Sequence, residues 1–127
     1  MGATTIKDLR ENGFVMIDGS PCRVEKVQVS TSGKHGHAKV RLEAIGILDN
    51  TRRSLIAPAH EPVEVPMVLK KNAQVLAVTG SRAQLMDMEN YEQFELEIPD
   101  ERKNQVIAGG EADYYEVVGI KTLKQLK

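Results

Sequence analysis

Two segments of alternating apolar and polar residues, joined by a glycine-containing stretch, constrain the fold of this chain more than any other feature. Residues 22–29 and 38–48 carry this alternation, which is typical of β-strands with one buried face. Gly33 and Gly36 lie in the connection, where glycine permits positive φ without a clash of Cβ. The sequence therefore predicts a β-hairpin that holds Lys34 on a tight, exposed loop.

The composition bounds the possible classes of protein. A length of 127 residues with 41% hydrophobic content suits one ordinary domain or two very small ones. The formal net charge of −1 provides no global field that would attract nucleic acid, so such binding requires a local patch. Cys22 is the single cysteine, which excludes an intramolecular disulfide and a cysteine-based zinc site. No segment has a signal-peptide core or the length of a membrane span, so we expect a soluble cytoplasmic protein without a membrane partner.

The first half of the chain has the pattern of a small barrel. Residues 1–13 are polar and expected to fray, with Ile6 and Leu9 available to pin them to the body. The alternation of apolar and polar residues shifts by one position across Glu25 and Lys26. A β-bulge there would return the following apolar residues to the inward face of the sheet and increase the local twist. Five or so short strands favour an SH3-like barrel, with strands expected at 14–17, 22–29, 38–48, 53–57 and 63–65.

A seam is expected at residues 66–71, so we predict one domain at 1–69, which carries the lysine loop, and a second at 70–127. Pro99 followed by Gly109 and Gly110 predicts a short helix at 100–108. Three strands, this helix and two more strands are the order of an OB-fold. The predicted fold class is therefore all-β, with two small β-barrel domains, an N-terminal SH3-like barrel and a C-terminal OB-fold with one short helix. The strands expected in the second half are 74–78, 83–88, 91–98, 114–120 and 123–126.

Charge is unevenly distributed along the chain. Residues 30–42 contain Lys34, Lys39, Arg41 and two histidines but no acid, whereas residues 87–101 contain seven acids and no Lys or Arg. The first of these segments suits contact with RNA phosphates. We interpret the acidic segment as a solvated face, and Met86 and Met88 in the second half of the chain as barrel packing.

No grouping of catalytic or metal-binding residues is recognisable in the sequence. His35 and His37 alternate along an extended backbone and would point to opposite sides, so we predict no metal site. Lys34 is followed by His35 rather than Ser or Thr, which excludes a nucleotide-binding P-loop. Neither a Ser-His-Asp nor a Cys-His grouping is present, and we expect a protein without catalytic residues.

Residues 30–39 read Ser-Thr-Ser-Gly-Lys-His-Gly-His-Ala-Lys, and this motif is highly specific. With support from residues 17–23, 63–66, 73–75 and 84–88, the chain resembles translation initiation factor 5A in its compact archaeal form. That family is related to bacterial elongation factor P. One departure is Ser32, where the family more often carries Pro or Thr.

The resemblance implies a set of functional expectations centred on Lys34. This residue would be converted to deoxyhypusine or hypusine by deoxyhypusine synthase, which transfers an aminobutyl group from spermidine, and no other cofactor is expected. The factor would bind the ribosome beside the acceptor end of the peptidyl-tRNA. There it would promote peptide-bond formation at poorly reacting sequences such as proline runs. Gly33 and Gly36 would shape the loop, and the residues expected to contact RNA or the modifying enzyme are His35, His37, Lys39 and Arg41.

Two other interpretations stay open at this point. The chain could be a plain RNA-binding module with Lys34 unmodified, which an intact mass of the protein from its native host would distinguish. It could also be a hydrolase acting on RNA through His35 and His37. That reading requires turnover that survives repurification and is lost in His37→Ala.

Overall fold

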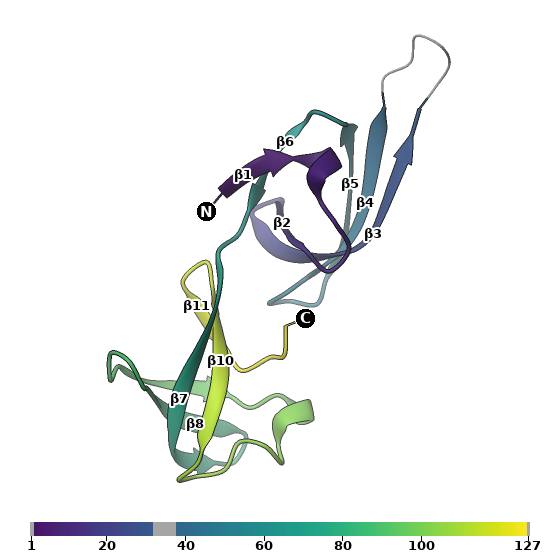
Figure 1. Ribbon diagram of the computed structural model, residues 1–127. Helices are drawn as coiled ribbons and strands as arrows, with labels where there is room; N and C mark the ends of the chain where they lie inside the picture. Colours follow the sequence, from purple (N-terminus) through teal and green to yellow (C-terminus); the bar gives the residue numbers. More distant parts are fainter. Residues whose placement is uncertain (1, 32–37, 127) are drawn as a thin grey trace. The chain divides into compact units, whose positions relative to one another are not determined.

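The computed structural model describes residues 2–31 and 38–126 of the chain. The chain divides into two compact units, unit 1 of Met1–Met67 and unit 2 of Val68–Lys127. Each unit is built from antiparallel strands with one short 3-10 helix (Figure 1). The prediction of an all-β protein is confirmed. Within the described residues, no helix reaches the length and hydrophobicity needed to cross a membrane.

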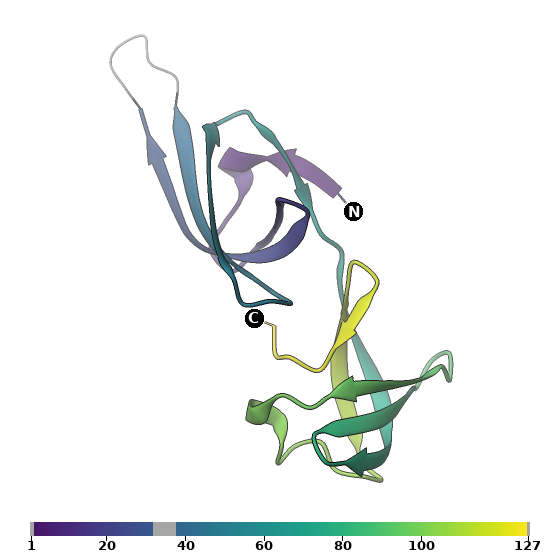
Figure 2. The same cartoon turned by 180° about the vertical axis from the view of Figure 1, so that it is seen from behind.

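Unit 1 consists of a four-stranded sheet and a two-stranded ribbon. The sheet has the order β2-β3-β4-β5, and the ribbon pairs β1 with β6. Figures 1 and 2 show β3, β4 and β5 running side by side. The elements are β1 (Gly2–Thr5), η1 (Ile6–Asp8), β2 (Phe14–Ile17), β3 (Ser20–Ser30), β4 (Lys39–Gly46), β5 (Arg52–Pro58) and β6 (Pro62–Val65).

The N-terminal segment belongs to the fold of unit 1 rather than fraying from it. Gly2–Thr5 pairs with β6, and the backbone N–H of Ile6 donates to the carbonyl of Glu61 at 2.9 Å. Ile6 and Leu9 are buried, as expected from the sequence. The expectation of frayed residues was therefore wrong for residues 2–9, because pairing with β6 satisfies their backbone groups.

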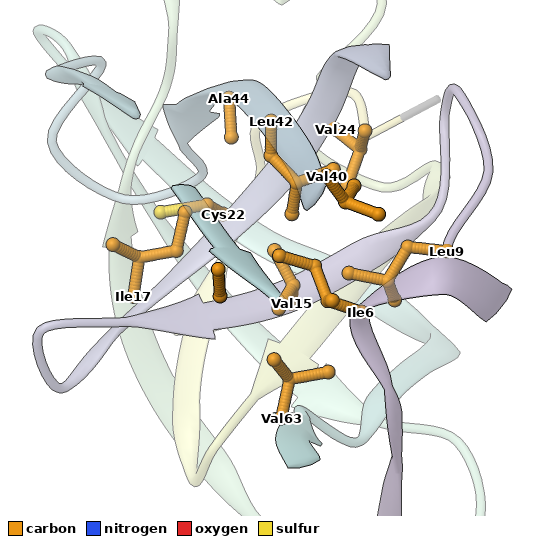
Figure 3. Packing of buried hydrophobic residues seen from close by; sticks show 11 residues of the cluster. Ile6, Leu9, Val15, Ile17, Cys22, Val24, Val40, Leu42, Ala44 and Val63 are labelled. Carbon is orange, nitrogen blue, oxygen red and sulfur yellow. The ribbon is translucent and has the colours of Figure 1, made fainter. Parts of the chain in front are cut away.

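The core of unit 1 is made by the inward residues of these strands (Figure 3). The alternation seen in the sequence places Val40, Leu42 and Ala44 of β4 inside. Full burial of a Val or Leu side chain contributes about 1.5–3 kcal/mol relative to exposure. The buried cluster contains Ile6, Leu9, Val15, Ile17, Cys22, Val24, Val40, Leu42, Ala44, Ala57 and Val63.

The predicted β-bulge in β3 is confirmed. The register between β3 and β4 shifts between Val24 and Lys26, which leaves Glu25 as the additional residue. After the shift, Val27 pairs with Leu42 and faces the core side of the sheet. The bulge therefore keeps the apolar residues on one face along the whole of β3.

Unit 2 is a five-stranded antiparallel sheet with the order β11-β10-β7-β8-β9. The long strand β7 pairs with β10 on one side and with β8 on the other, and its register shifts between Val75 and Ala77. The elements are β7 (Val68–Thr79), β8 (Arg82–Asp87), β9 (Gln93–Glu97), η2 (Asp100–Arg102), β10 (Glu111–Val117) and β11 (Ile120–Thr122). The core contains Ala73, Val75, Ala83, Leu85, Ile98, Val106, Ala112, Tyr114 and Leu123.

The helix of unit 2 is shorter than the sequence predicts. Instead of residues 100–108, it spans only Asp100–Arg102. From residue 100 to 108, only Arg102 and Val106 are buried, so the segment has no apolar stripe that would stabilise a longer helix by packing.

The C-terminal strand also differs from expectation. The last strand is Ile120–Thr122, and residues 123–126 are not a strand. Leu123 is buried, and its carbonyl accepts a hydrogen bond from the Arg102 guanidinium at 3.1 Å. A side chain therefore satisfies this backbone group in place of a neighbouring strand.

Candidate functional site

The candidate site is the end of the hairpin formed by β3 and β4. The two strands pair from Cys22 opposite Gly46 to Ser30 opposite Lys39, and residues 31–38 connect them. Of the predicted site residues, Lys39 and Arg41 are described by the structure. The predicted roles of Gly33, Lys34, His35, Gly36 and His37 lie outside the described residues.

Lys39 and Arg41 share the exposed face of β4. Both side chains are exposed, whereas Val40 and Leu42 are completely buried. This arrangement follows from the strand period of two, which sends successive side chains to opposite faces. The apolar residues thus fix which face of the hairpin carries the two cations.

The cross-strand neighbours of these cations carry no charge. Lys39 lies opposite Ser30 on β3 and opposite Pro58 on β5. Arg41 lies in the same way between Gln28 and Ile56. Directly opposite residues interact most strongly across a sheet, and neither cation has a carboxylate in that position on β3 or β5.

Further from the hairpin end, two glutamates lie beside residues of opposite charge. Glu43, the next residue on this face of β4, lies opposite Lys26 on β3. Glu25 accepts a charge-assisted hydrogen bond from Arg52 at 2.7 Å. On the described part of the hairpin, Lys39 and Arg41 therefore lie opposite uncharged residues at the end that carries residues 31–38, whereas Lys26 lies opposite a carboxylate.

A compact turn supports the opposite end of β4. A Cβ on Gly46 would lie 1.9 Å from Oδ1 of Asp49 and 2.7 Å from Nη1 of Arg53. Arg53 donates to Asp49 at 2.9 Å, and this hydrogen bond lowers the pKa of the Asp49 carboxyl well below its usual range. Asp49 also accepts the backbone N–H of Thr51 at 3.0 Å, so one carboxylate fixes the turn between β4 and β5.

The remaining candidate groups of unit 1 do not form a reactive centre. Cys22 is buried, and burial raises the pKa of its thiol, so the residue packs as a small hydrophobe as expected. His60 is exposed after β5. Among residues 2–31 and 38–126, no three His, Cys, Asp or Glu side chains are placed to share a metal ion.

A buried polar pair in unit 2 was missed by the sequence analysis. Asp87 was interpreted as part of a solvated acidic face, but it is only 2% exposed and accepts a hydrogen bond from Tyr114. Burial and this hydrogen bond raise the pKa of Tyr114, and the same bond lowers the pKa of Asp87. The alternation along β8 could have predicted the burial of Asp87, because Ala83, Leu85 and Asp87 occupy every second position and all face the core.

Met88 is likewise not the core residue that was expected. It follows the end of β8 and is 44% exposed, whereas Met86 is half-buried. The strand ends at Asp87, whose carboxylate accepts the backbone N–H groups of Glu89 and Asn90. Met88 therefore lies in the turn after β8 rather than in the strand, and its side chain does not follow the alternation of buried and exposed residues along β8.

Known proteins resemble this chain along almost its whole length. Residues 3–61 match the family model described as "Translation initiation factor 5A-like, N-terminal". A translation initiation factor 5A from Archaeoglobus fulgidus is 46% identical over 121 residues, which cover 95% of this chain and 94% of the relative. A protein of the same name from Methanothermobacter thermautotrophicus is 43% identical over 122 residues, covering 96% and 94%.

A solved structure extends the likeness to three dimensions. The protein titled eukaryotic translation initiation factor 5A from Methanococcus jannaschii matches with a TM-score of 0.89 and 37% identity. The match covers 99% of this chain and 94% of that chain, and it confirms the predicted fold of two small β-barrels. With identities above 40% to two factors of that name over nearly their full length, the chain belongs to the translation initiation factor 5A family, a family of translation factors.

Proposed function

We propose that this translation factor acts on the ribosome through Lys34, which carries a deoxyhypusine or hypusine made from spermidine by deoxyhypusine synthase. It binds next to the acceptor end of the peptidyl-tRNA. There it promotes peptide-bond formation at sequences that react poorly, such as proline runs. Its place of action is the cytoplasm, where translation takes place.

One observation supports this proposal above the others. The last pair of the β3–β4 hairpin is Ser30 with Lys39, and residues 31–38, which include Lys34, join these two strands. Lys39 and Arg41 are exposed at this end, and their opposite residues on β3 and β5 are uncharged. Cations of this kind bind phosphate oxygens without reading sequence, which suits a protein that docks on many ribosomes in one orientation.

The chemistry of an extended lysine fits this role. An ammonium on a four-carbon stem is a compact cation. An added aminobutyl arm lengthens its reach and supplies a second amine. Such a thin cationic rod can follow an RNA strand into a site that is too narrow for a protein backbone.

We infer that the contribution to the reaction is positional. Holding the acceptor end in a reactive orientation removes translational and rotational entropy from the barrier. The factor itself supplies no acid, base or nucleophile, and the ribosome remains the enzyme. His35 and His37 contact RNA or the modifying enzyme, while Gly33 and Gly36 shape the loop.

Peptide-level mass spectrometry of the protein from its native host tests the modification. We expect an aminobutyl adduct, with or without an added hydroxyl group, on the peptide that contains Lys34. The other lysines provide the internal comparison, because deoxyhypusine synthase is expected to act on this loop alone. Unmodified Lys34 in the native protein would favour the plain RNA-binding module and would reject the proposal.

A further inference from the structure

The barrel of unit 2 is open along one seam. Its sheet ends at β9 on one side and at β11 on the other, and neither strand pairs with a second strand in the part of the chain that the structure describes. A cavity of about 400 Å³ lies between them. Ligand pockets commonly have volumes of about 300–1,000 Å³. The residues lining the cavity are Leu96, Glu97, Ile98, Pro99, Asp100, Lys121, Thr122 and Lys124.

Lys121 links the two edge strands near the start of β9. Lys121 of β11 forms an ion pair with Glu92 at 2.9 Å, and its ammonium lies 5.2 Å from the centre of the Phe94 ring. Thr122 and Lys124, further along the chain, line the cavity beside residues 96–100. Four successive antiparallel pairings separate β9 from β11, so the two edge strands run in the same direction. Lys121 contacts Glu92 and Phe94 near the start of β9 and also lines the cavity, which extends to residues 96–100 at the end of β9.

The hydrogen-bond pattern shows which backbone groups of β9 are free for a partner. Ile98 donates its N–H to the carbonyl of Ser81 at 2.7 Å, and the carbonyl of Glu92 accepts the N–H of Asp87 at 2.9 Å. The register between β8 and β9 is continuous. Because alternate residues of an antiparallel strand bond to the same neighbour, the even-numbered residues of β9 face β8.

It follows that the N–H and C=O groups of Gln93, Glu95 and Glu97 face away from β8. A row of such groups on an edge strand is a template for pairing with another extended chain. The side chains of these three residues are exposed, whereas Leu96 is half-buried and Ile98 is buried. The edge thus has an acidic outer face and an apolar inner face.

We propose that the free edge of β9 binds an extended segment of another protein in which Lys or Arg alternates with apolar residues. Its basic side chains would lie across from Glu95 and Glu97, where opposite charges stabilise a strand pair. Its apolar side chains would point to the other face, toward Leu96 and the cavity. Residues 87–101 contain seven acids and no Lys or Arg, which disfavours an RNA strand at this edge. The proposal does not depend on Lys34.

Amide hydrogen exchange of the full chain, followed by NMR, tests the proposal. The probe is a peptide with blocked ends that repeats Lys-Val, and the control is a peptide of the same composition with its lysines and valines in two separate blocks. We expect the alternating peptide to slow exchange of the Glu95 and Glu97 amides by about tenfold or more, since each would gain a hydrogen bond. The block peptide is expected to slow neither.

Two variants at one position separate backbone pairing from charge. Glu95→Pro removes the N–H that faces the seam, and an edge strand tolerates proline on that side. Glu95→Ala keeps this N–H, and both variants lose the ion pair with Arg82. We expect the peptide to protect the Glu97 amide in Glu95→Ala but not in Glu95→Pro, with an unchanged pattern of other NMR signals in both. Glu97→Gln, which leaves the backbone intact, is expected to weaken peptide binding.

Each alternative result overturns the proposal. Unchanged exchange of the Glu95 and Glu97 amides at the highest soluble peptide concentration would mean that the edge is closed to strands. Equal protection by the block peptide would show that charge alone acts. Stronger protection by an RNA oligonucleotide, or protection that rises with protein concentration without peptide, would assign the edge to RNA or to a second copy of the chain.

Discussion

Tyr114 donates the hydrogen bond of its phenolic hydroxyl to Oδ2 of Asp87 inside unit 2. The two residues lie on β10 and β8, which are both neighbours of β7 but do not pair with each other. Oδ1 of Asp87 accepts the backbone N–H groups of Glu89 at 2.8 Å and Asn90 at 3.0 Å. One carboxylate therefore links the interior of the barrel to the turn that follows β8.

Tyr114→Phe is expected to lower the free energy of unfolding of unit 2 by about 1–3 kcal/mol, because Oδ2 of Asp87 then loses the donor that Tyr114 provides while the carboxylate remains buried. The ring itself is retained, so its contact with Phe94, at 4.9 Å between ring centres, persists. Urea denaturation measures the loss. The matched control is Tyr115→Phe. The hydroxyl of Tyr115 donates a 3.3 Å hydrogen bond to the carbonyl of Leu126, which is only partly buried. An equal loss in both variants would contradict the role given to the Asp87 carboxylate.

The same pair predicts a pH dependence of stability. The hydrogen bond from Tyr114, aided by backbone N–H groups, lowers the pKa of Asp87 in the folded state. Its carboxyl therefore stabilises the fold above the unfolded pKa of about 3.9, and this contribution is lost as the pH falls through the lower folded pKa. We expect the urea midpoint of unit 2 to decrease below about pH 4, and Asp87→Asn to flatten this decrease. A slope that is unchanged in Asp87→Asn would assign the acid sensitivity to other carboxylates.

Arg102→Met is expected to destabilise unit 2 strongly. The Arg102 guanidinium is buried and donates to the carbonyl of Leu123 at 3.1 Å and to Oδ1 of Asp113 at 2.9 Å. Loss of one partner of a buried pair costs about 3–5 kcal/mol, and the partial exposure of Asp113 places the expected loss near the lower value.

Arg82→Met provides the control for that variant. Arg82 pairs with Glu95 where both side chains are about half exposed, at 51% and 57%. Exposed pairs of this kind contribute at most about 1 kcal/mol. Thermal or urea unfolding of both variants gives the comparison, and similar losses would refute a structural role for the buried guanidinium.

Local periodicity was sufficient to predict the hairpin and its bulge. The alternation along β4 placed Val40 and Leu42 inside and Lys39 and Arg41 outside, as the structure has them. The phase change at Glu25 predicted the extra residue in β3. Both features depend on neighbours in sequence, which is why the sequence alone reveals them.

Contacts between distant segments could not be predicted in the same way. Nothing near Arg102 in sequence indicates that its guanidinium would bond to the carbonyl of Leu123. The burial of Asp87 follows the parity of its strand, but its partner Tyr114 lies on another strand. The roles of Lys34 and its loop neighbours stay predictions, since residues 32–37 are outside the described part of the chain.

Charge reversal at the hairpin end is expected to weaken ribosome binding. Lys39→Glu and Arg41→Glu each remove one expected phosphate contact. In a plot of the logarithm of the ribosome-binding constant against the logarithm of the salt concentration, each variant should therefore reduce the magnitude of the slope by about one. Filter binding to ribosomes over a series of salt concentrations measures this slope. Lys26→Glu changes the same charge further along the hairpin, opposite Glu43, and is expected to change the slope little. An equal effect of Lys26→Glu would mean that binding senses overall charge rather than this end of the hairpin.

The synthesis of a peptide with consecutive prolines by ribosomes from the native host tests the role of Lys34 most directly. The comparison uses the natively modified protein, the unmodified protein and Lys34→Arg, with a proline-free peptide as the control. We expect only the modified protein to accelerate the proline-containing peptide, by about tenfold or more if positioning lowers the barrier by on the order of 1.4 kcal/mol. Full acceleration by the unmodified protein or by Lys34→Arg would contradict the assignment of function to the modified lysine.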